Sequence, residues 1–235
     1  MNLLAILLFV GTMLISLWAT FRVKRVYRRY SQIPASSRAT GAQVAAAILQ
    51  RAGIQDVEIV AQEGMLGDHY DPTHKRLVLS RENYQGSSLA ALGVSAHECG
   101  HAIQHHLAYS PLHWRMAAVG ITNFASQIVM FLPLLGLFTS GLHSFSWTTI
   151  GWIMAAAWGV IMVFNLITLP VEFDASTRAK RILGEMGFIG TDEEMAGVRK
   201  TLDAAAWTYV AAFITSLAYF LYHLLPLLLG GRRDD

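Results

Sequence analysis

The chain has 235 residues, of which 54% are hydrophobic and only 14% are charged. Soluble domains carry about 25% charged residues, so this composition indicates an integral membrane protein. The formal net charge of +2 is too small to suggest nucleic-acid binding, and the single cysteine, Cys99, excludes an intramolecular disulfide; we expect it to be a small buried apolar residue.

The first apolar stretch, residues 1–21, is long enough to cross a bilayer, which takes about 20 residues. It lacks the basic start and the small-residue cleavage site of a signal peptide. Basic residues follow it instead, namely Arg22, Lys24, Arg25, Arg28 and Arg29. By the positive-inside rule we expect the N-terminus outside the cell and the chain from residue 22 onward in the cytosol.

Residues 22–115 have the pattern of a small α+β portion. Helical spacing of apolar residues predicts a helix over residues 41–51. Residues 56–60 and 76–80 have the composition of strands. The segment between them contains several glycines and the pair Asp71-Pro72, so we expect it to be mostly turn.

The last predicted element of this portion is a helix over residues 89–106, which Ser87 or Ser88 can cap. It is apolar only in its first half and is too short and too polar at its end to be a membrane span. We therefore expect it in the cytosol or at the bilayer surface.

The sequence HECGH in this helix fits the pattern H-E-x-x-H. On a helix, His97 and His101 lie on one face about one turn apart, so both imidazoles can bind one zinc ion. Glu98 projects beside the metal, where it can take a proton from water that zinc has made more acidic. His105 lies about 12 Å from His97 along the axis, so we expect it and His106 to form only a polar helix end.

A catalytic zinc needs a third protein ligand and an open position. The longer motif H-E-x-x-H-x-x-G-x-x-H would supply a third histidine, but Gln104 and Leu107 stand at its last two defined places. The ligand must therefore be remote in sequence. The next two spans, residues 116–140 and 147–169, form a hairpin that returns the chain to the cytosol, where a remote ligand can meet the helix.

Residues 170–203 form the second cytosolic portion, with a helix break predicted at residues 187–191. Glu172 and Asp174 follow the third span directly. Spacing alone leaves Glu172 evenly divided between a metal ligand and a solvated carboxylate at a helix start. Asp174 is the competing ligand, and three histidines are weaker candidates: His69, His74 and His113.

A fourth span over residues 204–229 and a tail over residues 230–235 complete the chain. Arg232 and Arg233 in this tail mildly oppose its expected position outside the cell. The predicted fold class is a mostly α integral membrane protein, in which four transmembrane helices accompany a small α+β cytosolic portion that carries the zinc site.

Three separated motifs resemble, in order, those of one known family. GDHYDPTHKRLVLS, SLAALGVSAHECGHAIQ and LPVEFDAS resemble segments of the YugP-type neutral zinc metallopeptidases of bacterial membranes. The likeness covers nearly the whole chain, including the four spans. It implies a hydrolase acting on peptide bonds, with one zinc ion per chain, in the bacterial inner membrane with its active site facing the cytosol.

The element EFDAS is also similar, more distantly, to E-F-x-A-D of the heat-shock and prenyl-protein membrane endopeptidases. There the glutamate is the third zinc ligand and the aspartate supports the first histidine, so the resemblance implies Glu172 as third ligand. Ser176 stands where that aspartate would be, and a serine gives weaker support. Asp174 is the alternative residue for this role.

We therefore expect a membrane-embedded zinc metalloendopeptidase in which Glu98 deprotonates a water and later protonates the leaving amine. The expected partners are a membrane-associated or unfolded polypeptide substrate and the lipid bilayer, without nucleic acid; the sequence does not indicate an oligomeric state. The strand over residues 76–80 is a candidate edge for an extended substrate, or it merely completes the sheet. Candidate donors to the oxyanion are His69, Tyr70 and Arg178.

Three other functions compete with this hypothesis. A non-catalytic zinc-bound membrane scaffold or chaperone-like protein would close its site with four ligands and would have no use for Glu98. A metal transporter would place ionisable residues inside its spans, where this chain has almost none. Cleavage within the bilayer would need the H-E-x-x-H helix at membrane depth, whereas its polar neighbours indicate the interface.

Overall fold

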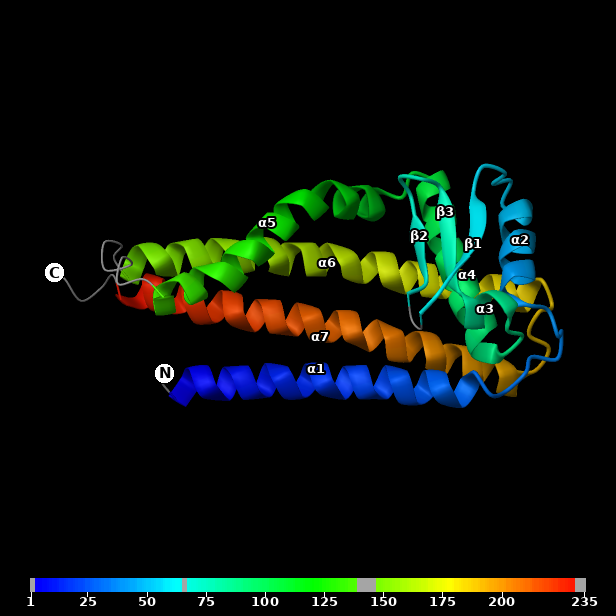
Figure 1. Ribbon diagram of the computed structural model, residues 1–235, viewed down its shortest axis with the longest axis horizontal. Coiled ribbons are helices and arrows are strands. Elements are labelled where there is room, and N and C mark those ends of the chain that lie inside the picture. Colours follow the sequence, from blue (N-terminus) through cyan, green and yellow to red (C-terminus); the bar gives the residue numbers. More distant parts are fainter. Residues whose placement is uncertain (1–2, 65–66, 139–146, 231–235) are drawn as a thin grey trace. The chain divides into compact units, whose positions relative to one another are not determined.

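The computed structural model describes residues 3–64, 67–138 and 147–230, which are mostly helical (Figure 1). Within these residues the elements follow in the order α1 (Leu3–Tyr30), α2 (Gly41–Arg51), β1 (Glu58–Gln62), β2 (His69–Asp71), β3 (Arg76–Ser80), α3 (Arg81–Gln85), α4 (Leu89–His106), α5 (Ser110–Phe138), α6 (Trp147–Glu185) and α7 (Asp192–Gly230).

The chain divides into two compact units, which we describe separately. The helical unit comprises residues 1–17, 114–169 and 209–235, and the sheet unit comprises residues 18–113 and 170–208.

The helical unit takes its segments from α1, α5, α6 and α7, which are long and apolar enough to cross a membrane. Mean hydropathy in their best windows is 1.6 to 2.3, and only 6 to 17% of the residues in those windows are buried. Side chains this apolar and this exposed to their surroundings fit contact with lipid better than contact with water. The four predicted spans fall in these helices, apart from their ends at residues 1–2 and 139–140, which lie outside the described range.

Hydrogen bonds and a ring stack join α6 to α7 inside the helical unit. Asn165 donates from Nδ2 to Ser216 Oγ at 3.0 Å and to the carbonyl oxygen of Ala212 at 3.2 Å. The rings of Trp158 and Tyr219 stack with their centroids 4.6 Å apart. The amide matters because a polar side chain in an apolar span has few other partners.

The sheet unit contains a three-stranded sheet in the order β1-β3-β2. β1 pairs parallel to β3, and β2 pairs antiparallel to it, so β3 is the central strand. Leu77 and Leu79 of β3 point to one face of the sheet and are fully buried, and Val78, which points to the other face, is 9% exposed. Figure 1 shows the sheet beside α2 and α4.

The sheet corrects three predictions. The strand expected over residues 56–60 is displaced and runs over Glu58–Gln62. The segment expected to be mostly turn contains β2, which was missed because three polar residues carry no detectable alternation. The prediction that residues 76–80 offer an edge to a substrate is wrong, because both edges of β3 are already paired.

Side chains close in sequence cap the N-termini of the helices in this unit. Thr40 and Gln43 form a reciprocal capping box at the start of α2, and Ser88 accepts a hydrogen bond from the backbone of Ala91 at the start of α4. Both helices have the predicted bounds. The short helix α3 was not predicted; it begins where Ser80 ends β3 and caps the following turn.

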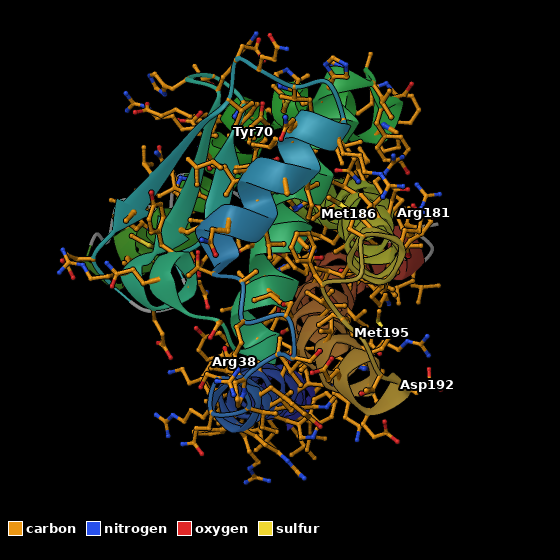
Figure 2. All side chains as sticks on the ribbon, turned by 90° about the vertical axis from the view of Figure 1, so that its right-hand side faces the viewer. Arg38, Tyr70, Arg181, Met186, Asp192 and Met195 are labelled. Carbon is orange, nitrogen blue, oxygen red and sulfur yellow. The ribbon has the colours of Figure 1, made fainter. Side chains whose placement is uncertain are left out.

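A hydrophobic core lies between α2, α4, the sheet, the C-terminal end of α6 and the N-terminal end of α7. Cys99 is fully buried in it, as expected, and burial followed by the charge of Glu98 raises the pKa of its thiol. Met186 and Met195, labelled in Figure 2, pack against this core at the turn between α6 and α7. This turn lies at the predicted break, since α6 ends at Glu185 and α7 begins at Asp192.

A buried polar network joins α1 to the sheet. The hydroxyl of Tyr27 donates to Asn83 Oδ1 at 2.8 Å, and Asn83 Nδ2 donates to Asp68 Oδ2 at 3.0 Å. Asp68 Oδ1 accepts from the backbone and the hydroxyl of Ser80 at 2.7 and 3.1 Å. Asn83 is fully buried, and these bonds satisfy both ends of its amide.

Candidate metal centre

The two histidines of the H-E-x-x-H pattern lie side by side on α4. Their ring centroids are 4.7 Å apart, and only 14% of the His97 side chain and 10% of the His101 side chain is exposed. Residues four apart on a helix share a face, so the helix alone brings the two rings together.

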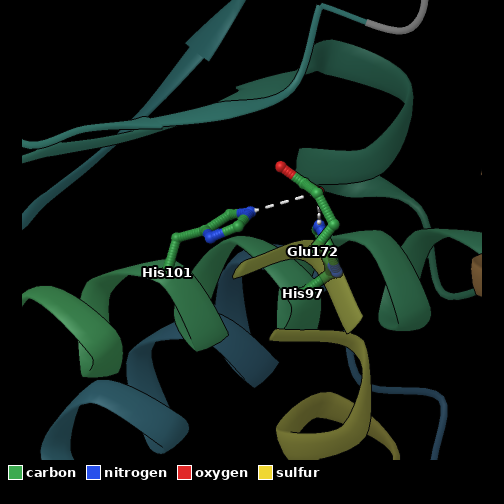
Figure 3. A group of neighbouring side chains, drawn as sticks. All are labelled: His97, His101 and Glu172. Carbon is green, nitrogen blue, oxygen red and sulfur yellow. Dashed lines mark ion pairs between the residues drawn. The ribbon is translucent and has the colours of Figure 1, made fainter. Parts of the chain in front are cut away.

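The third side chain comes from α6, and all three converge on one point (Figure 3). Glu172 Oε2 lies 3.3 Å from His97 Nε2 and 3.6 Å from His101 Nε2, with the carboxylate almost fully buried. Within the described ranges of the chain, this is the one group of three histidine, cysteine, aspartate or glutamate residues whose ligand atoms all lie within 4.8 Å of one another.

A close approach of α4 to α6 makes this convergence possible. A Cβ atom added to Gly100 would lie 2.8 Å from the carbonyl oxygen of Ala175 and 3.0 Å from its Cα. A real Cβ does not approach backbone so closely, so a side chain here would force the two helices apart. Gly100 is next to His101 and Ala175 is one turn from Glu172, so the contact sets the distance between the ligands.

The spacing of the three ligand atoms fits a zinc ion. Two ligands that each lie about 2.0–2.1 Å from a tetrahedral zinc ion are about 3.3 Å from one another. The separations of 3.3 and 3.6 Å between the glutamate oxygen and the two imidazole nitrogens are close to this value. Two imidazoles and one carboxylate are also a donor set of catalytic zinc sites, which keep a fourth position open.

Hydrogen bonds from neighbouring residues hold the outer nitrogens of both rings. Ser176 Oγ lies 3.1 Å from His97 Nδ1, so the serine does contact the first histidine. Gln104 Oε1 lies 2.9 Å from His101 Nδ1. Asp174, which we expected as an alternative support for His97, instead accepts from Gln104 Nε2 at 2.8 Å and from Arg178 Nε at 2.6 Å.

The ionisable side chains at the candidate metal centre shift one another's pKa values. Burial acts to raise the pKa of Glu172, but the hydrogen bonds and charges of His101 and His97 outweigh it, so that pKa is held well below its usual range. Burial acts to lower the pKa of His101, but its hydrogen bond with Glu172 and the charges of Glu98 and Glu172 outweigh it, so that pKa is raised. A buried carboxylate is thus stabilised as an anion where a cation would sit.

Glu98 lies on the same helix between the two histidines. Its side chain is buried, with 7% of the residue exposed, and its charge raises the pKa of His101. A carboxylate held this close to the candidate metal position can exchange a proton with water there.

The predicted oxyanion donors are engaged elsewhere. His69 is exposed, and its Nδ1 lies 2.8 Å from the carbonyl oxygen of Gly67. The hydroxyl of Tyr70 lies 2.9 Å from His105 Nδ1, and burial followed by the charges of Asp56 and Asp71 raises the pKa of this phenol to about 12, so it stays protonated. Arg178 is paired with Asp174.

Tyr70 and His105 also line a cavity of about 260 Å³ with Lys75, Ala102 and His106. His105 thus has a tertiary contact in addition to its expected place at the polar end of the helix. His105 does not belong to the group of three ligands, as the spacing along the helix predicted.

Sequence reasoning gave no role to Gln104 or Gly100, and it did not consider Tyr109. Burial and then the charge of Asp174 raise the pKa of the Tyr109 phenol, which places this tyrosine near the same acidic residue. One signal for Gln104 was available: it follows His101 by three residues, a spacing that places two helical side chains next to each other.

Comparisons with known proteins agree with the geometry. Residues 5–228 match the profile of the family described as "Putative neutral zinc metallopeptidase". The chain is 42% identical over 232 residues to the "Putative membrane protease YugP" of Bacillus subtilis (strain 168). The aligned region covers 99% of this chain and 100% of that protein. No solved structure is significantly similar to the chain. The resemblance predicted from three sequence motifs is confirmed, and the chain belongs to the neutral zinc metallopeptidase family.

Proposed function

We propose that this protein is a membrane zinc endopeptidase that hydrolyses peptide bonds in membrane-associated or unfolded polypeptides. The observation that carries the proposal is the convergence of His97, His101 and Glu172 within 4.8 Å, with Glu98 on the same helix. Membership in a zinc metallopeptidase family and likeness to a protein named as a membrane protease support it.

His97 and His101 would hold the ion through Nε2, and Glu172 would hold it through Oε2. When bound, zinc supplies a Lewis acid that polarises the scissile carbonyl and lowers the pKa of water toward neutrality. His101 and Glu172 are buried and His97 is only partly exposed, which strengthens the electrostatic effect of these side chains on the reacting atoms.

Glu98 would take the proton from the attacking water and later donate it to the leaving nitrogen as the carbon–nitrogen bond breaks. Its burial and the effect of its charge on the pKa of His101 support a position near the reacting atoms. Both oxygens of the new carboxyl group are then accounted for, one from the substrate and one from water.

A non-catalytic zinc scaffold fits these observations less well. Structural zinc sites are closed by four protein ligands, whereas the group found in the described part of the chain has three. A scaffold also gives no reason to bury a carboxylate such as Glu98 next to the ligands.

The decisive experiment compares Glu98→Gln with the wild-type protein in detergent or lipid nanodiscs. We expect bound zinc to remain at one ion per chain, while cleavage of casein or a quenched fluorescent peptide falls by about 10²–10⁴-fold, because general acid–base catalysis is lost. Glu193→Gln, on an exposed glutamate in the first turn of α7, is the matched control and should retain activity. Unchanged cleavage by Glu98→Gln would exclude this mechanism.

We further propose that the four apolar helices cross the inner membrane and that the metal centre faces the cytosol. The basic residues after the first apolar stretch support this orientation. The test uses single cysteines at the exposed positions Glu82 and Asp203, because native Cys99 is buried. In intact cells both should resist a membrane-impermeant maleimide and react after lysis, whereas labelling of either one in intact cells would contradict the proposed orientation.

A further inference from the structure

We propose that Gln104 is a positioning residue that holds the ring of His101 with Nδ1 protonated and Nε2 free to bind metal. This inference rests on the proposed zinc centre, because it states how one of its ligands is oriented. It assigns a role to a residue that lies outside the H-E-x-x-H pattern.

The orientation of the Gln104 amide follows from its partners. Nε2 lies 2.8 Å from the backbone carbonyl oxygen of Val171 and 2.8 Å from Asp174 Oδ2. A carbonyl oxygen and a carboxylate only accept hydrogen bonds, so both must receive N–H groups. Rotating the amide by 180° would place its oxygen against two acceptors, and Gln104 is fully buried, without water to relieve that repulsion.

The orientation of the amide decides the protonation of His101. With both N–H groups directed at α6, Oε1 is the atom that faces His101 Nδ1 at 2.9 Å. Oε1 can only accept, so Nδ1 must carry a proton and donate it. In the neutral imidazole that binds metal, the one proton then lies on Nδ1, so the lone pair of Nε2 is available to the ion, and Nε2 is the atom that lies 3.6 Å from Glu172 Oε2.

The residues behind Gln104 keep the amide in place. Asp174 Oδ2 also accepts from Arg178 Nε at 2.6 Å, so this oxygen faces two N–H donors and is the acceptor in both hydrogen bonds. Val171 and Asp174 flank Glu172 on α6, so one turn of that helix supplies a ligand and, through Gln104, the support for another. His97 lacks such a chain and has the Ser176 hydroxyl, which can donate or accept.

Zinc affinity is the first test. The substitution Gln104→Leu keeps the approximate volume but removes the acceptor for His101 and both donors to α6. Loss of an outer hydrogen-bond partner of a zinc-bound histidine lowers metal affinity by about 10–100-fold, and we expect a loss in this range from competition with a fluorescent chelator. The control is Asn83→Leu, which removes an equally buried amide from the polar network of the same unit and should change zinc affinity less than about threefold.

Asp174 gives a graded second test. Asp174→Asn keeps an oxygen that can accept from Gln104 and should lose less zinc affinity than Asp174→Leu, which keeps none. If the two Asp174 variants are equal, or if Gln104→Leu and Asn83→Leu weaken zinc binding to the same extent, Gln104 is only part of the general packing and the inference is overturned.

The third test does not depend on any variant that must fold. In zinc-loaded wild-type protein with ring-¹⁵N histidine, solid-state NMR should show a protonated Nδ1 and a metal-bound Nε2 for His101. Metal bound to Nδ1 would overturn the inference while leaving the proposed hydrolysis intact. A wild-type protein that binds no zinc would contradict both the proposed function and this inference. A wild-type protein that binds zinc but hydrolyses no peptide would contradict the proposed function alone.

Discussion

The helical unit and the sheet unit satisfy their polar side chains in different ways. In the helical unit, hydroxyls mostly bond within their own helix: Thr122 Oγ1 donates to the carbonyl oxygen of Ala118, and Thr168 Oγ1 donates to that of Phe164. In the sheet unit, Gln104 donates hydrogen bonds to Val171 and Asp174, which lie 67 and 70 positions further along the chain. Bonds within one helix satisfy polar groups where the surroundings are apolar. Bonds between distant residues position the side chains of the candidate metal centre.

This difference predicts where perturbations act. A change at the metal centre should destabilise the sheet unit and leave the helical unit as it is. A change within the helical unit should alter stability modestly and leave zinc binding unchanged. The following experiments test that separation, beginning with the largest expected effect.

Removal of zinc is the largest perturbation. A ligand present at 1,000 times its dissociation constant stabilises the folded state by about 4 kcal/mol, so a chelator should remove about this much from the sheet unit. Hydrogen exchange should then accelerate in peptides from α4 and from residues 170–185, with little change in peptides from residues 116–135. Equal acceleration in both sets would show that the units unfold as one and would remove the basis of the comparison.

The same difference explains which features could be predicted from sequence. Hydropathy and length located the four apolar helices, since both properties belong to the residues of each helix alone. The bounds of α2 and α4 were predicted from local sequence, namely the helical spacing of apolar residues in α2 and the cap at Ser87 or Ser88 before α4. β2 was not predicted, because it exists only through its pairing with β3.

The residues of the candidate site also differ in whether local sequence was enough to predict them. His97, Glu98 and His101 follow from spacing on one helix, which a sequence displays directly. Glu172 was left undecided by spacing and was supplied by resemblance, because its approach to α4 depends on a contact between helices. That contact is set by the backbone of Ala175 against a residue without a side chain, and an absent side chain leaves no hydrophobic pattern to detect.

Gly100→Ala tests this contact and should have the second-largest effect. The new Cβ would lie 2.8 Å from the carbonyl oxygen of Ala175, and overpacking of this kind typically costs about 1–3 kcal/mol. Because the displaced helices carry the ligands, zinc affinity should fall as well. Chemical or thermal unfolding in detergent and chelator competition would measure the two effects.

Gly120→Ala in α5 is the matched control for this substitution. A Cβ at Gly120 would meet no atom within 4 Å, and alanine favours a helix by up to about 1 kcal/mol relative to glycine. This variant should be at least as stable as the wild type and should bind zinc equally well. If Gly100→Ala behaves like Gly120→Ala, the close approach of α4 to α6 is not what sets the ligand spacing.

The smallest expected effect is that of Asn165→Leu, which removes the amide that joins α6 to α7 in the helical unit. Hydrogen bonds between membrane helices contribute only about 0.6 kcal/mol on average, and leucine is well tolerated in lipid, so stability should fall by roughly this amount. Zinc affinity and peptide cleavage should be unchanged, since Asn165 belongs to the other unit. A loss of zinc affinity comparable to that of Gly100→Ala would mean that a contact between α6 and α7 governs the ligand on α6. In that case the separation between a unit built by local bonds and a unit built by long-range bonds would not hold.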